Sequence, residues 1–233
     1  MKHADARFAY DTKKYITCGP KKSEMKHLFT ILALVAAAHT AMAQARPVAD
    51  MAKFENQLKT SAEKLKSIES DFTQVKHLDM FDENVTSKGQ FYYLKDNKIS
   101  LDYSKPLSYL IVINGGRLKI VADGKKSVMQ LNTNKMMNEM QDMITACMVG
   151  DLSRMNNNYE LTYQEDDRQY IVSITPRSKT VKEYVSAIEI RLSKADMSVD
   201  QLRMYENEAD YTDYRFTNKR FNQLTDESRF KID

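Results

Sequence analysis

Residues 89–131 read GQFYYLKDNKISLDYSKPLSYLIVINGGRLKIVADGKKSVMQL. Apolar and polar residues alternate along this stretch, which is typical of half-buried β-strands. Turn-forming sequences divide it at Asp96-Asn97, Pro106, Asn114-Gly115-Gly116 and Asp123-Gly124. Because these connections are too short for helical crossovers, the strands must form an antiparallel meander. We predict five consecutive strands over residues 89–95, 98–104, 107–113, 117–123 and 126–131.

Two helical patterns accompany these strands. The first covers residues 50–72, with Asp50 placed to act as its N-cap and an apolar stripe of Met51, Phe54, Leu58, Leu65, Ile68 and Phe72. The second covers residues 133–149, is rich in methionine, and is followed by Gly150 as a stop signal. After it, period-two patterns predict further strands over residues 159–164, 169–175, 184–192, 199–206 and 211–221.

The order of these elements predicts an α+β fold that is mainly β. The 233-residue chain is long enough to bury a sizeable core without disulfides, and it contains no internal repeat or linker. A large antiparallel sheet in one domain curls, and the two helices are available to cover its concave side. We therefore expect a single curved sheet covered by an N-terminal helix and a methionine-rich helix.

The N-terminal residues have the pattern of an export signal. Met25-Lys26-His27 begins a basic segment, residues 28–38 are an apolar run, and Ala41-Met42-Ala43 is a cleavage motif. Eleven apolar residues are too few to span a bilayer, which argues against a membrane anchor. We expect a signal peptide over residues 25–43, an upstream extension over residues 1–24, and one exported domain over residues 44–233.

Loss of this leader changes the charge of the protein. Residues 1–43 hold seven of the 35 basic and three of the 32 acidic residues, so residues 44–233 carry 28 basic and 29 acidic residues. The net charge falls from +3 to −1, which leaves no general attraction to nucleic acid.

Residues 44–233 offer few groups for catalysis. His77 is their one histidine and Cys147 their one cysteine, and no nucleophile motif lies beside either. We expect no catalytic residues, no metal site and no cofactor, and hence no enzyme. A pair of acidic residues for glycoside hydrolysis stays open, because no spacing in the sequence identifies such a pair.

The apolar face of the predicted sheet and the methionine-rich helix allow two interpretations. Both can form an ordinary core, or the strands can line a cavity beneath a movable helix, since methionine adapts to variable apolar ligands. Alternation places on one sheet face Phe91, Tyr93, Ile99, Leu101, Tyr103, Ile111, Ile113, Leu118 and Ile120. The sequence alone leaves both interpretations open.

Several ordered motifs resemble the LolA family of periplasmic lipoprotein carriers. They are Ile68-Glu69-Ser70-Asp71-Phe72-Thr73-Gln74, Ser87-Lys88-Gly89-Gln90-Phe91-Tyr92-Tyr93, Lys98-Ile99-Ser100-Leu101-Asp102-Tyr103 with Pro106, and Ile111-Val112-Ile113-Asn114-Gly115-Gly116-Arg117-Leu118-Lys119-Ile120. The similarity is clearest over residues 50–150. It implies an incomplete antiparallel β-barrel covered by helices, with a cavity for the acyl chains of lipoproteins.

The resemblance also implies a binding site and partners. The expected lipid-binding residues are Leu58, Leu65, Phe72, Phe91, Tyr93, Ile99, Leu101, Tyr103, Ile111, Ile113, Ile120, Met136, Met140, Met143 and Ile144. Lys95 replaces the arginine by which many family members control the lid, and it lacks the planar guanidinium fork. The expected partners are acylated lipoproteins, an ATP-driven release complex of the inner membrane, and an outer-membrane acceptor or the membrane itself. We expect a periplasmic monomer.

Two other roles stay open at this point. A related half-barrel could sense lipoproteins or carry another lipid. A secreted carbohydrate-active enzyme would instead need a polar cleft with two close carboxylates.

Overall fold

The computed structural model describes residues 45–131, 133, 135–152, 155 and 157–233. The expected signal peptide (25–43) and upstream extension (1–24) lie outside the described residues. None of the helices in the described part of the chain is long and apolar enough to cross a membrane.

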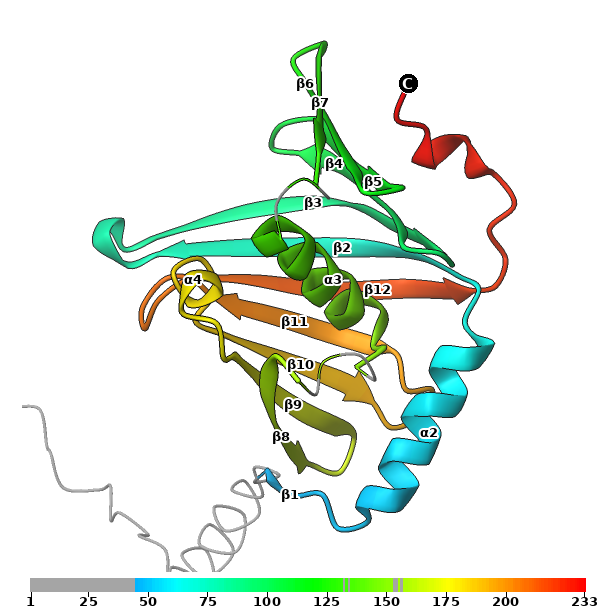
Figure 1. The fold of residues 1–233 in the computed structure, drawn as a ribbon, viewed down its shortest axis with the longest axis vertical. Helices are drawn as coiled ribbons and strands as arrows, with labels where there is room; N and C mark the ends of the chain where they lie inside the picture. The colour runs from blue at the N-terminus through cyan, green and yellow to red at the C-terminus, as the bar shows by residue number, and fades with distance from the viewer. Residues whose placement is uncertain (1–44, 132, 134, 153–154, 156) are drawn as a thin grey trace, which may run out of the picture. The chain divides into compact units, whose positions relative to one another are not determined.

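A single antiparallel sheet dominates the fold (Figure 1). Across the described residues it has twelve strands in the order β1-β8-β9-β10-β11-β12-β2-β3-β4-β5-β6-β7. Their bounds are β1 Arg46–Pro47, β2 Ser67–Leu78, β3 Glu83–Leu94, β4 Lys98–Lys105, β5 Tyr109–Asn114, β6 Arg117–Ala122, β7 Lys125–Gln130, β8 Tyr159–Glu165, β9 Gln169–Pro176, β10 Ala187–Ser193, β11 Val199–Tyr205 and β12 Tyr211–Phe221. The helical elements are α2 Met51–Lys64, α3 Lys135–Val149, α4 Lys179–Lys182 and the 3₁₀ turns η1 Asp79–Phe81 and η2 Glu227–Phe230.

The sheet consists of two meanders that meet in its middle. Strands β2 to β7 follow one another in sequence and space, as do β8 to β12, and β12 pairs with β2. Phe216 lies opposite Phe72 at this junction. With β1 at one edge and β7 at the other, the sheet is curved but open, and it does not close into a barrel. The predicted mainly-β fold with an incomplete barrel is confirmed.

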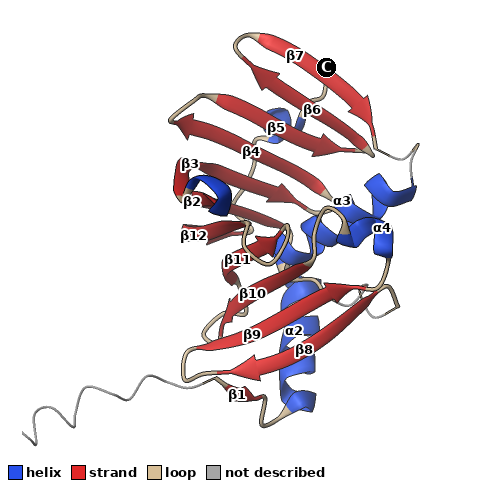
Figure 2. Cartoon of the chain, turned by 90° about the vertical axis from the view of Figure 1, so that its left-hand side faces the viewer, coloured by secondary structure: helices blue, strands red, loops and turns tan. Residues whose placement is uncertain are grey.

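Helices α2 and α3 lie on the same side of the sheet, which we call the inner face (Figure 2). Strand pairing explains why this face is apolar. Tyr93 lies opposite Ile99, Ile99 opposite Ile113, and Ile113 opposite Leu118, so one row of side chains on this face runs across four strands. The strand register therefore aligns the alternating apolar residues of neighbouring strands on the same face of the sheet.

The predicted helix over residues 50–72 is wrong beyond Lys64. Helix α2 begins as expected, with the Asp50 carboxylate accepting a hydrogen bond from the Lys53 backbone N–H at 2.9 Å. At Leu65 the backbone becomes extended, and residues from Ser67 onward form β2. Ile68 and Phe72 fit a helical stripe, but with Ser70 they also alternate with Glu69 and Asp71. These residues form a strand because they pair with β3 on one side and with β12 on the other. This pairing satisfies the backbone N–H and C=O groups along both edges of β2.

Other differences from the predicted elements are smaller. Strand β3 begins at Glu83 rather than at Gly89, because its first residues continue the long hairpin with β2. The remaining predicted bounds differ from the observed ones by three residues or fewer. The short elements β1, α4, η1 and η2 were not predicted.

The opposite side of the sheet, the outer face, has its own small core. Tyr92 of β3 and Val112 of β5 are buried there beneath Phe230 and Ile232 of the C-terminal segment. The side-chain amide of Asn114 donates to the Phe230 carbonyl at 3.0 Å, and the Lys119 ammonium donates to the Lys231 carbonyl. The C-terminal segment is thereby held against β5 and β6 by polar as well as apolar contacts.

We expect Gly89→Ala to destabilise the sheet strongly. A Cβ atom on Gly89 would overlap the Asp102 carbonyl oxygen of β4 and lie 2.8 Å from Phe72 Cζ. Because the backbone atom cannot move aside without separating β3 from β4, the free energy of unfolding should fall by about 3 kcal/mol in a urea titration. The adjacent exposed change Lys88→Ala should alter it by less than about 0.5 kcal/mol, and an equal loss in both variants would contradict this explanation.

We expect Phe230→Ala to lower the free energy of unfolding by about 3 kcal/mol, because it empties the centre of the outer core. Phe230 is 1% exposed, whereas the neighbouring Lys231 side chain is exposed. Lys231→Ala is therefore the matched control and should leave the thermal midpoint nearly unchanged. If Phe230→Ala also leaves it unchanged, the C-terminal segment does not stabilise the sheet.

Candidate functional site

An apolar interior lies between the inner face and the two long helices. Fourteen of the fifteen predicted lining residues belong to its cluster in the described part of the chain. Seven are buried: Phe72, Phe91, Tyr93, Ile99, Leu101, Tyr103 and Met143. Seven are partly buried and pack against them: Leu58, Leu65, Ile111, Ile113, Met136, Met140 and Ile144. Ile120 of β6 is half-buried and lies outside the cluster.

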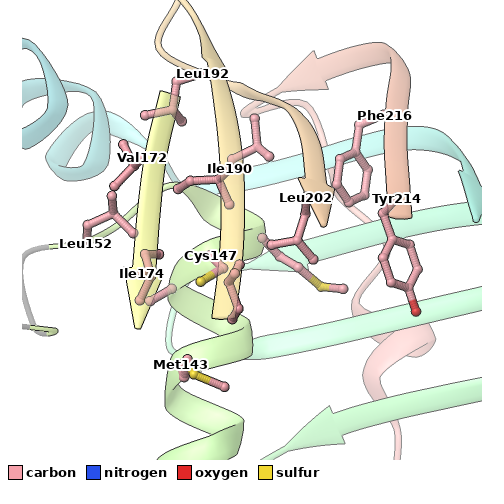
Figure 3. Packing of buried hydrophobic residues seen from close by; sticks show 14 of the residues in the cluster. Met143, Cys147, Leu152, Val172, Ile174, Ile190, Leu192, Leu202, Tyr214 and Phe216 are labelled. Carbon is pink, nitrogen blue, oxygen red and sulfur yellow. The ribbon is translucent and has the colours of Figure 1, made fainter. Parts of the chain in front are cut away.

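Helix α3 is embedded in this interior rather than laid over it. Met143, Cys147 and Met148 are each less than 5% exposed. Figure 3 shows Met143 and Cys147 on α3 together with Ile174 of β9 and Ile190 of β10, and all four belong to the same apolar cluster. Burial raises the pKa of the Cys147 thiol, so the thiol stays protonated. The helix ends at Val149, and Gly150 follows with a φ of +79°, as the predicted stop signal requires.

Aromatic side chains form the floor of the interior. The rings of Phe72 and Tyr103 meet edge to face at 4.9 Å, and Tyr109 stacks on Tyr103 at 4.0 Å. The hydroxyls of Tyr103 and Tyr214 share a hydrogen bond of 3.0 Å. Burial raises the pKa of Tyr214 to about 12, so these phenols remain neutral and satisfy each other in apolar surroundings.

Two pockets remain around α3. The first has a volume of about 210 Å³ and lies among the C-terminal ends of α2 and α3, strands β2, β3 and β12, and the β10–β11 turn. Its lining comprises Ser61, Lys64, Leu65, Ile68, Ser70, Phe91, Met148, Val149, Asp196, Met197, Ser198, Val199, Phe216, Lys219, Phe221 and Asn222. The second, of about 130 Å³, lies between α3 and residues that include Tyr93, Asn97 and Tyr159. Both are smaller than the roughly 300–1,000 Å³ of usual ligand sites.

Sequence reasoning identified two residues of the first pocket, Leu65 and Phe91, as lipid-binding candidates. It placed Ile68 on the apolar stripe of the first helix without including it among the lipid-binding candidates, and it missed Phe216 because the last predicted strand had no assigned inner face. Met197 lies in a polar turn, where no periodic signal marks it, and Val199 is the first residue of a predicted strand whose inner face the sequence did not identify. Ser70 was also missed, since a serine within an apolar row carries no signal of its own.

Lys95 lies in the exposed turn between β3 and β4. Its backbone N–H donates to the Lys66 carbonyl at 2.8 Å. Its side chain forms no hydrogen bond or ion pair with the residues that the structure describes. Asn97, two residues further along, lines the second pocket together with Glu139 and Asp142 of α3. A role of Lys95 in lid control stays a prediction.

The described residues contain no group of three or more His, Cys, Asp or Glu side chains placed to bind a metal ion. His77 stacks on Tyr211, and its Nδ1 lies 3.1 Å from the Asn84 side-chain oxygen, whereas Cys147 lies on the buried face of α3. The structure therefore does not bring this histidine and this cysteine together as a base and nucleophile.

Three solved structures are similar to this chain at low sequence identity. A LolA superfamily protein from Nitrosomonas europaea is 9% identical, with a TM-score of 0.39 over 73% of this chain and 94% of its own. The lipoprotein LppX from Mycobacterium tuberculosis is 10% identical, with a TM-score of 0.42 over 74% and 94%. A complex of MucA and MucB from Pseudomonas aeruginosa gives 14% identity and a TM-score of 0.46 over 78% and 61%.

No curated protein matches the chain. A family model described as outer membrane lipoprotein carrier protein LolA, however, matches residues 63–233. This match begins at the end of α2 and includes strands β2 to β12, helix α3 and the C-terminal segment. The chain therefore belongs to the LolA family, whose members are carriers or binding proteins for lipids and lipoproteins.

Proposed function

We propose that this protein is a periplasmic chaperone that binds the acyl chains of lipoproteins beneath α3 and shuttles them from the inner to the outer membrane. The observation that carries the proposal is the apolar interior, in which a methionine-rich helix contacts the same cluster as the sheet. The fourteen clustered candidates would contact the acyl chains. The main cluster of the described interior is apolar, which favours acyl chains over a carbohydrate as its ligand.

The small size of the two pockets implies that α3 must move before cargo can enter. Pockets of about 210 and 130 Å³ leave no space for several long chains. Side chains of α3 occupy the space that the chains would need, and three of them, Met136, Met140 and Ile144, are only partly buried. In this proposal the structure corresponds to the closed form.

The contacts of α3 favour such movement. Methionine side chains repack at little cost because they are unbranched and flexible. Two buried atoms of α3, Gln141 Oε1 and Thr145 Oγ1, are among the described side-chain atoms that lack a hydrogen-bond partner. Each unsatisfied group weakens the closed packing by about 1–3 kcal/mol. The closed form is therefore stable, but these two unpaired atoms make the packing of α3 weaker than it would be if both had hydrogen-bond partners.

The same arrangement explains binding and release. Each acyl CH₂ removed from water contributes roughly 0.8 kcal/mol, so a diacylated cargo needs an enclosing carrier. When α3 returns to the inner face, its apolar side chains replace the cargo as the cover of the sheet. Closure of the helix thus competes with the cargo and lowers its affinity at the acceptor.

The remaining parts of the proposal follow from the sequence. We propose that residues 44–233 form the exported domain and that the signal peptide directs it to the periplasm as a monomer. It would receive cargo from an ATP-driven release complex in the inner membrane and deliver it to an outer-membrane acceptor. Lys95 would control α3 only in the open form.

We expect Met140→Glu to weaken binding of a fluorescent diacylated lipopeptide by about ten-fold or more, measured by titration. The substitution places an unpaired carboxylate where Met140 contacts the apolar cluster, and such a charge is costly to bury. Asn138→Glu adds the same charge on an exposed position of α3 and should bind the lipopeptide like the wild type. Equal affinity for Met140→Glu and the wild type would show that the lipid does not contact α3.

We expect Met143→Ala to accelerate alkylation of the buried Cys147 thiol by about 30-fold or more. Met143 is 1% exposed, and removing its side chain should weaken the packing of α3 by at least about 2 kcal/mol. Peptide mass spectrometry can follow the reaction at Cys147, with exposed Asn138→Ala as the control. An unchanged rate in a variant that is less stable would show that the packing of Met143 does not control access to Cys147.

A further inference from the structure

Among the buried side-chain atoms that the structure describes in the first pocket, one polar atom lacks a hydrogen-bond partner. Ser70 of β2 is 6% exposed, and its hydroxyl oxygen has no hydrogen-bond partner in the part of the chain that the structure describes. Ser67 is buried in the same strand, but its hydroxyl does have a partner. It accepts a hydrogen bond from the Leu224 backbone N–H at 3.2 Å. A buried hydroxyl without a partner is costly, and replacement by alanine would remove that cost.

The Ser70 side chain faces the pocket. Ser70 lies opposite Phe91 in the β2–β3 pairing, so the two side chains share the inner face, and both line the first pocket. Their neighbours in the lining, Ile68 and Phe216, are apolar. A serine hydroxyl can both donate and accept a hydrogen bond, and toward a ligand group that has no N–H or O–H, such as an ester, it can only donate.

The position of Ser70 along β2 fits the polar linkage of a lipid. The pocket opens where exposed Lys64, Asp196 and Asn222 line it, and the Asn222 backbone N–H donates to the Ser67 carbonyl at 2.9 Å. Ser70 lies three residues further along the strand, about 10 Å inside this opening. Beyond it come Phe72 and the aromatic floor, whose polar side-chain atoms are the hydroxyls of Tyr103, Tyr109 and Tyr214.

We infer that Ser70 donates a hydrogen bond to an ester carbonyl of the bound lipid, and that the site thereby selects ester-linked acyl chains. This inference rests on the proposed function. The ester carbonyl lies at the depth of Ser70, and the acyl chain continues from it toward Phe72. The polar part of the cargo extends out of the pocket between α2 and the β10–β11 turn. Without bound lipid the Ser70 hydroxyl is buried with no hydrogen-bond partner, which is unfavourable. Lipid binding removes this unfavourable term by supplying an acceptor.

The test compares two synthetic lipopeptides of equal chain length, one with ester-linked and one with ether-linked chains, titrated against the purified protein. The ether lacks the carbonyl acceptor. We expect the wild type to bind the ester about 3- to 10-fold more tightly, as one net hydrogen bond implies. Ser70→Ala should bind both lipopeptides equally, with a thermal midpoint no lower than that of the wild type.

Ser100→Ala is the matched control, because Ser100 is 1% exposed on the outer face of β4 and lies opposite Tyr92. It should retain the preference for the ester. Ser70→Cys keeps nearly the same volume but donates weakly, so its preference should shrink even if Ser70→Ala folds poorly. Equal binding of ester and ether by the wild type, or a preference that survives in both Ser70 variants, would overturn the inference and leave the carrier function intact. Failure of the wild type to bind either lipopeptide would overturn both.

Discussion

The pairing of β12 with β2 is the contact on which the rest of the structure depends. It joins the meander β2–β7 to the meander β8–β12, whose strands are otherwise separated by α3 in the sequence. Because Phe216 meets Phe72 at this junction, the apolar rows of both meanders become one continuous inner face. Helix α3 then has a surface to pack against that neither meander provides alone. The pocket containing Ser70 also exists only because β2, β3 and β12 are neighbours.

The interior has to satisfy two opposing requirements. A carrier must bury enough apolar surface to remain folded when empty, and it must give up part of that burial to admit cargo. The strands meet the first requirement, since their side chains are locked in register from Tyr93 to Leu118. Helix α3 meets the second with flexible methionines and two unpartnered polar atoms. Within one core, the strands therefore provide the stability and α3 provides the adaptability.

Local patterns predicted much of this fold and less of the site. Residues 89–131 were assigned correctly because turn residues punctuate a clear period of two, and fourteen of the fifteen candidate residues lie in one cluster. Residues 65–72 were misassigned because Ile68 and Phe72 fit both a helical and a strand period, and only pairing with distant strands decides between them. The roles of Ser70 and Met197 depend on contacts between segments far apart in sequence. Phe230 and Ile232 are two apolar residues in a polar tail, which is no signal for burial.

The C-terminal segment has a consequence for how the molecule can deform. It covers Tyr92 and Val112 on the outer face of β3 and β5, while the opposite face of the same strands belongs to the apolar interior. Residues at the centre of these two strands, around Tyr92 and Val112, are therefore covered on both faces, whereas all six residues of the edge strand β7 are exposed. Their amide hydrogens should exchange with solvent last, and β7 should exchange early. The covered parts of β3 and β5 therefore stay ordered when α3 moves away from the inner face, and the strand pairing of the sheet is unchanged.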